Sequence, residues 1–566
     1  MKVDSLKWWQ KAVFYQVYPR SFADGNGDGI GDIPGLISKL DYLQSLGIGA
    51  IWISPHYPSP MCDCGYDISD YMSVAPEYGT MDDFDRLIYE AHQRDIRIVL
   101  DLVLNHTSDQ HPWFIESRSN VDNPKRDWYV WGKGKDGNPP NNWYSTFGGS
   151  AWEKDDRTGE YYYHFFFKGQ PDLNWRNPDV KKAMFDMVRF WLDRGVDGFR
   201  LDAIGTIYEK PDWPNQNSGV TLDELKRKEL TVKDPKERRV LAQKFEMMFR
   251  DQHDQPGVHE LMQDLRKVID EYEDRVLIGE TDNLAFYGDG TNELHLVFNF
   301  PLKNVGRLTA AHVHRNQTKR LAGIPAGGWP CNTLGNHDSP RVYSQFGDGV
   351  HNAVQARLYL LMLLTLKGTP VLYNGEELGM TDFFLNRVDQ FRDPLSNDWY
   401  RLLIEVLGMA PDSAVREAAI RGRDRGRTPL QWSNTANGGF CPANISPWLP
   451  VNPEYQSGIN VEDEEKDPMS LLNEYRRMIH FRQASPALLA GEYVELSDTP
   501  RGILAFLRKS EEQTCLVVLN MTAQKRGIRL PAGFCGPKTG FSTVKNKLPE
   551  ISGDQLTLMP FEGVVL

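Results

Sequence analysis

Short apolar runs alternate with amphipathic segments along most of the chain before residue 490. A continuous apolar run of about four to eight residues is typical of a parallel strand that is buried on both faces. We expect eight such strands, at residues 13–18, 50–54, 96–103, 198–201, 275–279 and 294–300, in a run that ends near 333, and at 370–373. Parallel strands need long crossover connections, and the intervening segments are long enough to provide them.

The connecting segments carry the spacing and the end signals of helices. Leucine and isoleucine at helical spacing predict a helix that ends at Gly47. Thr80, with Asp83 three residues later, predicts a capped helix start, and Asn177 before a proline predicts another. The expected helices cover residues 34–46, 80–94, 178–193, 259–273, 353–366 and 470–481, with a surface helix within 211–256, whereas 384–467 is expected to be loop-rich.

Eight strands with intervening helices predict an α/β fold, a (β/α)₈ TIM barrel, rather than a doubly wound sheet. The alternation stops between residues 105 and 175, where a long irregular stretch predicts an inserted subdomain with one strand in the aromatic run 161–167. Short β runs separated by turn residues dominate after residue 490. The expected domains are the barrel at 1–104 and 176–490, the inserted subdomain at 105–175, and a C-terminal antiparallel β domain at 491–566.

Composition excludes several classes of function. The formal net charge of −13 argues against nucleic-acid or anionic-membrane partners, which favour basic surfaces. No apolar run approaches the roughly 18 residues of a membrane span, and the N-terminus lacks the features of a signal peptide. The six cysteines fit no zinc spacing, and Cys62 and Cys64 form only a C-x-C pair, so we expect reduced thiols in a cytoplasmic protein.

Acidic residues follow several of the apolar runs. The segment 101–106, Asp202, Glu280 and Asp338 each stand where a buried strand ends, and charged groups are rarely buried unless they are used. In a parallel barrel these strand ends converge on one face, which is where such barrels build catalytic sites. Arg200 lies two residues before Asp202 on the same strand, so it faces the same side, and its positive charge would keep Asp202 ionised.

Seven short motifs occur in a fixed order over nearly the whole chain, at residues 65–71, 101–106, 170–175, 198–202, 279–280, 336–338 and 375–380. With these motifs the sequence resembles the α-amylase superfamily, glycoside hydrolase family 13, and within it the α-glucosidase and oligo-1,6-glucosidase branch. The resemblance implies that Asp202 is the nucleophile, Glu280 the general acid/base and Asp338 a third carboxylate that holds sugar hydroxyls. A retaining glycosidase needs one ionised and one protonated carboxyl group, so Glu280 should have a raised pKa.

The resemblance also implies the residues that surround the reactive sugar. His106 and His337 would bind its hydroxyl groups, and Tyr66 would stack on its ring. Asp63 would bind the terminal glucose, paired with an arginine. Both Arg423 and Arg427 fit the family pattern for that arginine, and the sequence does not distinguish them.

The implied activity is that of a retaining, exo-acting α-glucosidase that acts on short α-glucosides. In the resembled branch the residue after the nucleophile tracks linkage, and the small Ala203 predicts an α-1,4 preference. The sequence departs from the family pattern at Cys62-Asp-Cys64-Gly65, where Asp-Asn often precedes Gly-Tyr-Asp, and at Ser339 and Asn374, where Gln is common. These departures leave open glucosyl transfer, sucrose hydrolysis or isomerisation, and oligo-1,6-glucosidase activity. Inactive transporter subunits also resemble this fold, but they carry a membrane span and lose the catalytic carboxylates.

A second candidate site lies near the N-terminus. Residues 24–32 place oxygen ligands at alternate positions, as the first part of an EF-hand loop does, but the closing bidentate glutamate is missing. The resembled family carries a structural Ca²⁺ in this loop, and Mg²⁺ is the alternative ion. The candidate ligands are Asp24, Asn26, Asp28, the Ile30 carbonyl and Asp32. No organic cofactor is expected.

Overall fold

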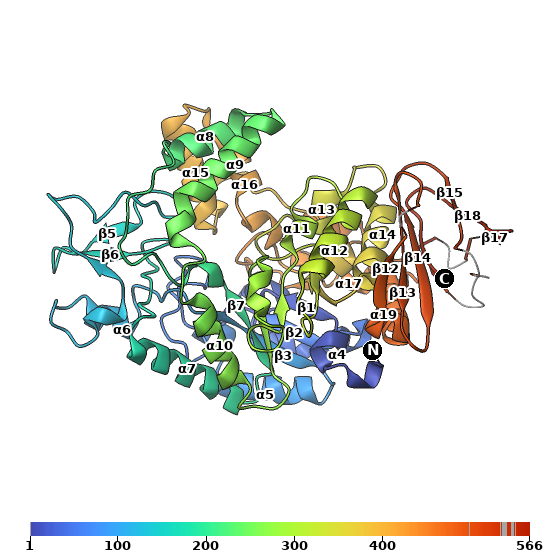
Figure 1. Cartoon of the computed structure of the whole chain (residues 1–566), viewed down its shortest axis with the longest axis horizontal. Coiled ribbons are helices and arrows are strands. Elements are labelled where there is room, and N and C mark those ends of the chain that lie inside the picture. The colour runs from blue at the N-terminus through green and yellow to red at the C-terminus, as the bar shows by residue number, and fades with distance from the viewer. Residues whose placement is uncertain (1, 497, 532–533, 535–539, 545–547, 550) are drawn as a thin grey trace.

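The eight predicted strands form one parallel sheet that curls into a nearly closed barrel (Figure 1). The computed structural model describes residues 2–496, 498–531, 534, 540–544, 548–549 and 551–566. The sheet order is β10-β11-β1-β2-β3-β7-β8-β9, and a parallel bridge from Phe298 to Cys331 extends the ladder from β9 towards β10. The strands are β1 Phe14–Val17, β2 Ala50–Ile53, β3 Arg97–Val103, β7 Gly198–Asp202, β8 Val276–Gly279, β9 Leu296–Val297, β10 Cys331–Thr333 and β11 Thr369–Tyr373. The predicted TIM barrel is confirmed.

The barrel helices follow the predicted end signals. The Thr80 hydroxyl and the Asp83 carboxylate make reciprocal capping bonds, and the Asn177 side chain accepts from the backbone of the next helix. The segment expected as one helix over 34–46 is two helices, because the backbone leaves helical geometry at Lys39. The bounds are α3 Ile33–Ser38, α4 Leu40–Leu46, α5 Met81–His92, α7 Pro178–Asp193, α10 Val258–Ile269, α11 Phe300–Lys303, α12 Ala310–Gly323, α14 Asn352–Thr365 and α18 Leu471–Gln483.

The prediction that residues 384–467 are loop-rich was wrong in part. This stretch contains α15 Pro394–Arg401, a π-helical turn at Leu402–Val406, α16 Pro411–Arg421 and α17 Val461–Lys466. The helices α15 and α16 bury a small hydrophobic cluster of their own, apart from the barrel core. Figure 1 shows them beside α8 Leu222–Thr231 and α9 Pro235–Phe249, where the four helices form a lobe above the barrel.

Two smaller β structures flank the barrel (Figure 1). Within the predicted insert, β4 Trp131–Gly132, β5 Trp152–Lys154 and β6 Tyr161–Tyr163 pair in the order β4-β6-β5, and α6 Pro112–Ser117 precedes them. Near the C-terminus, antiparallel sheets have the orders β12-β13-β14-β19-β16 and β15-β18-β17. Their strands are β12 Glu492–Glu495, β13 Ile503–Lys509, β14 Thr514–Asn520, β15 Arg526–Arg529, β16 Phe541–Ser542, β17 Ile551–Ser552, β18 Gln555–Leu558 and β19 Gly563–Val565. The exact domain boundaries stay a prediction.

None of the helices in the described ranges combines the length and the apolar character of a bilayer-spanning segment. The five cysteines in those ranges are free thiols, and Cys535 lies outside the described residues.

Candidate active site

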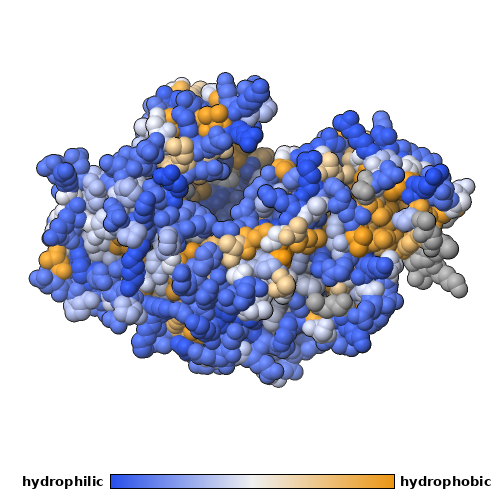
Figure 2. Space-filling view, viewed as in Figure 1, coloured by the Kyte–Doolittle hydropathy of each residue, from blue (hydrophilic) through white to orange (hydrophobic). Residues whose placement is uncertain are grey.

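The predicted catalytic carboxylates meet in one cavity at the carboxyl end of the barrel. Asp202 ends β7, Glu280 follows β8, and Asp338 lies on the loop after β10. Figure 2 shows the surface hollowed below the lobe that carries α8 and α15. The cavity has a volume of about 340 Å³ and is lined by Asp63, Tyr66, His106, Phe147, Phe166, Asp202, Ala203, Glu280, Asp338, Leu395, Arg421 and Arg423. The structure therefore brings most of the predicted site residues together.

One arginine joins the carboxylates at the base of this cavity. Arg200 is buried, and its Nη1 donates to Asp202 Oδ1 at 2.7 Å and to Asp101 Oδ1 at 2.7 Å. Its Nη2 lies 2.8 Å from Glu280 Oε1. The other oxygen of Glu280 accepts the backbone N–H of Ala203 at 2.9 Å. The nucleophile candidate and the acid candidate are therefore fixed by the same guanidinium.

The surroundings of Asp202 and Glu280 determine how many protons these two carboxyl groups hold. Burial raises the pKa of Asp202 to about 7, although Arg200 opposes this shift. Burial also raises the pKa of Glu280 to about 7, again against Arg200 and with added repulsion from Asp202 and Asp338. The raised Glu280 pKa agrees with the sequence prediction, whereas burial outweighs the opposing effect of Arg200 on the pKa of Asp202, so Arg200 alone does not keep Asp202 ionised. Near neutral pH the pair holds about one proton, as acid catalysis with a carboxylate nucleophile requires.

A bell-shaped dependence of kcat/KM on pH is therefore expected, with its maximum near neutral pH. Below the optimum a second proton neutralises the nucleophile, and above it the last proton leaves, so that no acid remains. Because the pKa values of both Asp202 and Glu280 are raised, the alkaline limb lies well above the range of ordinary carboxyl groups. Initial rates of glucose release between about pH 4 and pH 10 measure both limbs. A rate that stays flat above pH 5 would contradict the shared-proton arrangement.

Asp338 differs from the other two carboxylates because two arginines face it. Arg427 Nη2 lies 2.6 Å from Asp338 Oδ1, and Arg423 Nη1 lies 3.4 Å from the same oxygen. Burial raises the pKa of Asp338, but His337, Arg423 and Arg427 outweigh it and hold the pKa well below its usual range. Asp338 is therefore ionised throughout the neutral range and suits the role of a hydrogen-bond acceptor for sugar hydroxyls.

His337 and Tyr66 form a neutral wall beside these charges. Their rings stack with centroids 5.4 Å apart, and the Tyr66 hydroxyl lies 2.7 Å from His337 Nε2 and 3.1 Å from Asp101 Oδ2. Gln16 Nε2 lies 2.6 Å from His337 Nδ1, so its N–H fixes the imidazole with the proton on Nε2. Burial lowers the pKa of His337 well below its usual value, which keeps the ring neutral. Tyr66 also lines the cavity, where the resemblance expects it to stack on the sugar.

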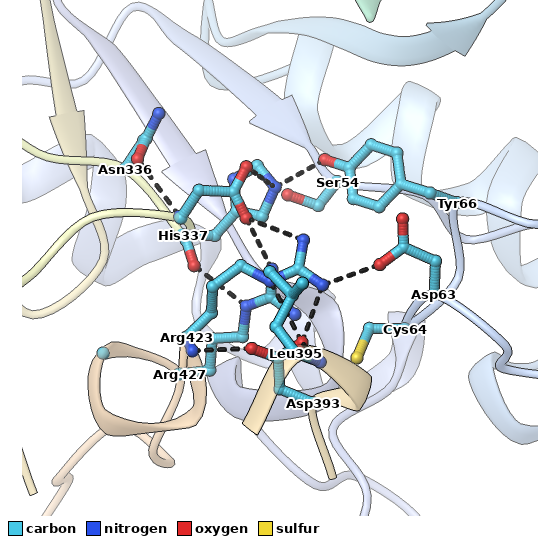
Figure 3. Close-up of polar contacts among 12 residues, drawn as sticks. Ser54, Asp63, Cys64, Tyr66, Asn336, His337, Asp393, Leu395, Arg423 and Arg427 are labelled. Atoms are coloured by element: carbon cyan, nitrogen blue, oxygen red, sulfur yellow. Dashed lines mark hydrogen bonds and ion pairs between the residues drawn. The ribbon is translucent and has the colours of Figure 1, made fainter. Parts of the chain in front are cut away.

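The structure selects Arg423 as the partner of Asp63 (Figure 3). Arg423 Nη2 lies 2.7 Å from Asp63 Oδ1 and 2.7 Å from Asp393 Oδ1, so the guanidinium stands between two carboxylates. Gln170 Nε2 donates to the other oxygen of Asp63 at 3.2 Å and lies 2.9 Å from His106 Nε2. The Asp63–Arg423 pair forms part of the cavity wall, together with His106.

Sequence reasoning missed several residues around the cavity. Asp393 is fully buried. An aspartate directly before a proline is typical of the start of a helix, so the sequence could have identified Asp393 as the cap of α15. Gln170 stands in one of the recognised motifs, but no role was assigned to it. Phe147, Phe166 and Leu395 line the cavity from loops and a helix far apart in the sequence, and no local pattern identifies them.

The loop at residues 24–32 has the form of an oxygen-rich turn. Asp24 accepts the backbone N–H groups of Gly27 and Gly29, and Asp28 accepts that of Ile30 at 2.8 Å. Asp32 caps α3 by accepting from Gly35 at 2.6 Å.

In the described part of the chain, none of the three aspartates of this loop has a basic partner. No group of three ionisable side chains there is arranged to hold a metal, so an ion would also need the Asn26 and Ile30 oxygens. Carboxylates without a basic partner, alternating with neutral oxygens, are ligand types that a hard cation accepts.

Comparisons with known proteins agree with this geometry. Residues 16–491 match the family model described as alpha amylase, catalytic domain, and residues 493–565 match maltogenic amylase, C-terminal domain. An oligo-1,6-glucosidase of Parageobacillus thermoglucosidasius is 40% identical, over 93% of this chain and 92% of that relative. The trehalulose synthase of Pseudomonas mesoacidophila MX-45 is 38% identical over 99% of both chains, with a TM-score of 0.87. A variant of that synthase, solved in complex with the substrate sucrose, matches with the same identity, coverage and TM-score.

Proposed function

This chain belongs to the α-amylase family of glycoside hydrolases, and from that premise we propose that it is a retaining, exo-acting α-glucosidase of short α-glucosides. The observation that carries the proposal is the single cavity in which Asp202 and Glu280 share Arg200, while the Asp63–Arg423 pair forms part of the wall. In this proposal the Asp63–Arg423 pair closes the pocket beyond the cleaved bond, behind one terminal glucose. This geometry favours exo action over cleavage inside a long chain.

Asp202 and Glu280 then carry out the reaction in two steps, with Asp202 as nucleophile and Glu280 as acid in the first step and base in the second. Asp202 attacks the anomeric carbon of the terminal glucose, while Glu280 donates its proton to the glycosidic oxygen and the aglycone leaves. The product of this step is a β-glucosyl ester on Asp202. Ionised Glu280 then removes a proton from water, the water oxygen attacks the anomeric carbon, and Asp202 leaves as a carboxylate. Two inversions release α-glucose, so the overall reaction is hydrolysis with retention.

Linkage and acceptor choice are the finer parts of the proposal. Ala203 adjoins the nucleophile and lines the cavity, and its small side chain supports an α-1,4 preference. Sucrose isomerisation is the second candidate, because solved structures of a trehalulose synthase match this chain over 99% of both chains. The two candidates share the glucosyl-enzyme intermediate and differ in whether water or released fructose attacks it.

An NMR time course of the anomeric protons with maltose, isomaltose and sucrose tests the proposal. Release of α-glucose from maltose at a higher rate than from isomaltose supports the α-1,4-glucosidase. A faster reaction with isomaltose overturns the linkage assignment, and new glucosyl–fructose linkages from sucrose move the function to an isomerase. No turnover of any of the three overturns the proposed function itself.

We further propose that the loop at residues 24–32 holds a structural Ca²⁺ or Mg²⁺, with Asp24, Asn26, Asp28, Ile30 and Asp32 as ligands. Chelation with EDTA is expected to lower Tm by on the order of 5 °C, because an ion that binds only the folded chain stabilises it. Added Ca²⁺ should restore Tm in the native protein but not in Asp24→Ala. An unchanged Tm after complete chelation would count against a bound ion.

A cytoplasmic location completes the proposal. Five free thiols in the described ranges, four of them buried at Cys64, Cys331, Cys441 and Cys515, suit a reducing compartment. The expected partner is a small α-glucoside, such as the carbohydrates bound by the related synthase.

A further inference from the structure

A buried lysine beside the catalytic carboxylates has no place in the mechanism derived so far. Lys303 ends α11, the short helix that follows β9 at the catalytic end of the barrel. The residue is only 6% exposed. Among the described residues no carboxylate lies within ion-pair distance of its Nζ, and the ring centroid of Phe300 lies 5.2 Å from the same atom. A buried ammonium group without an ion pair is costly, so its retention calls for a role.

The hydrogen bonds of Lys303 lead directly to the loop that carries Asp338. Lys303 Nζ donates to Ser339 Oγ, and Ser339 Oγ donates to Asn336 Oδ1 at 2.7 Å. The same Asn336 oxygen accepts the backbone N–H of Asp338 at 3.1 Å. Ser339 is one of the positions at which the sequence departs from the family pattern. The short serine side chain brings its hydroxyl within reach of the lysine, so the two residues act as a unit.

The charge of Lys303 also faces the catalytic centre. Burial lowers its pKa, whereas the carboxylates of Asp338, Glu280 and Glu376 raise it. These three groups are the charged side chains that face Lys303 from the loop after β10, the end of β8 and the turn after β11. The ammonium therefore adds a second positive charge that acts on Glu280, besides that of Arg200.

We propose that Lys303 is a positioning residue, which acts through Ser339 to hold the 336–339 turn and the Asp338 carboxylate in place against the substrate. This inference rests on the proposed glucosidase function. In this proposal the Lys303–Ser339 pair keeps Asp338 in the orientation that the transition state needs. Lys303 itself need not touch the sugar.

The test compares Lys303→Met, Ser339→Ala and the double variant on the α-glucoside that the native enzyme turns over fastest among maltose, isomaltose and sucrose. Each single change is expected to lower kcat by about tenfold to a hundredfold, with KM changed less than about threefold, because a buried hydrogen bond to a charged group is lost. The double variant should fall no further than Lys303→Met alone, since both changes break the same connection.

The pH profile separates positioning from a general loss of stability. Lys303→Met removes a positive charge near Glu280, so the alkaline limb of kcat/KM should move to higher pH. Ser339→Ala keeps the charge and should leave that limb in place while kcat falls. Lys367→Met is the matched control, because Lys367 also lies near an aromatic ring, Trp329, but at the opposite end of the barrel. The control should match the native enzyme in kcat and in both limbs.

The inference is overturned if Ser339→Ala keeps native kcat, if the effects of the two changes multiply in the double variant, or if Lys303→Met leaves the alkaline limb unmoved. Should Lys303→Met fail to fold, Ser339→Ala alone decides between the expected loss and native activity. Native enzyme runs in the same assay. No turnover by the native enzyme would reject the proposed function, whereas normal native turnover with unaffected variants would reject only the role of Lys303.

Discussion

Replacement of Asp202 by asparagine is expected to reduce the release of glucose from α-glucosides by about 10⁴-fold or more. Asparagine has the shape of aspartate, so the fold and the cavity should remain. Its neutral amide cannot form the glucosyl ester, and it also removes the 2.7 Å ion pair with Arg200. The loss should appear in kcat rather than KM, because the nucleophile makes its bond only as the reaction proceeds.

Asp197→Asn is the matched control for this variant. Asp197 precedes the same strand, β7, at its opposite end, is fully buried, and pairs with Arg97 at 3.0 Å. Its replacement should lower the melting temperature but change kcat by only a few-fold. If Asp202→Asn kept more than about 1% of native kcat, Asp202 would not be the nucleophile.

Azide offers a direct test of the same role. In Asp202→Ala, an azide anion has room to attack the anomeric carbon from the vacated face, while Glu280 still protonates the departing oxygen. The product is β-glucosyl azide, with the configuration inverted once instead of twice. Its appearance only in the Asp202 variant would identify the residue that normally occupies that face. If azide restored nothing in Asp202→Ala but formed the adduct in a variant of another cavity carboxylate, the assignment would move to that residue.

The barrel was predictable because its strands are buried on both faces. The apolar runs around β3 and β7 have the length and composition of strands buried in a parallel sheet, and polar residues mark where each run stops. The strand β9 covers only Leu296–Val297 and is shorter than the expected 294–300. The end of a strand is set by its hydrogen bonds to the neighbouring strand, not by the length of the apolar run. The helices α15 and α16 were missed because they are short and are stabilised by a small cluster around Leu403 and Ala418, a tertiary contact that the sequence does not display.

The residues of the candidate site also fall into two groups, those that the sequence could identify and those that only the folded chain could. Carboxylates at strand ends can be found from sequence, because burial at those positions demands a use. The side chains that pair with these carboxylates cannot be found from sequence, because the loops that carry them meet only in the folded chain. The choice of Arg423 over Arg427 depends on a 2.7 Å contact with Asp63, 360 positions away in sequence. The raised pKa of Asp202 likewise required the folded positions, because burial raises it and outweighs the lowering by Arg200, which also contacts Asp101 and Glu280.

Asp63→Ala is the second change with a large expected effect, a fall in kcat/KM for disaccharides of about 10²–10³-fold. Asp63 accepts charge-assisted and neutral hydrogen bonds from Arg423 at 2.7 Å and from Gln170 at 3.2 Å. Its removal leaves Arg423 bound only to Asp393 and Asp338, so the guanidinium is drawn away from the end of the cavity. Each lost charge-assisted bond in a buried site costs about 1.5–3 kcal/mol, or roughly one to two powers of ten.

The same variant tests whether this pair enforces exo action. Native enzyme acting on maltotetraose should release glucose from the first cycle if the Asp63–Arg423 pair, which forms part of the cavity wall, stops the substrate at its terminal sugar. With the pair broken, part of the product should be maltose, since a second sugar can extend past the position of Asp63. Asp70→Ala, an exposed aspartate in the same segment, is the control and should give glucose at the native rate. Maltose in the first native products, or native rates on disaccharides in Asp63→Ala, would show that another part of the cavity sets the end of the substrate.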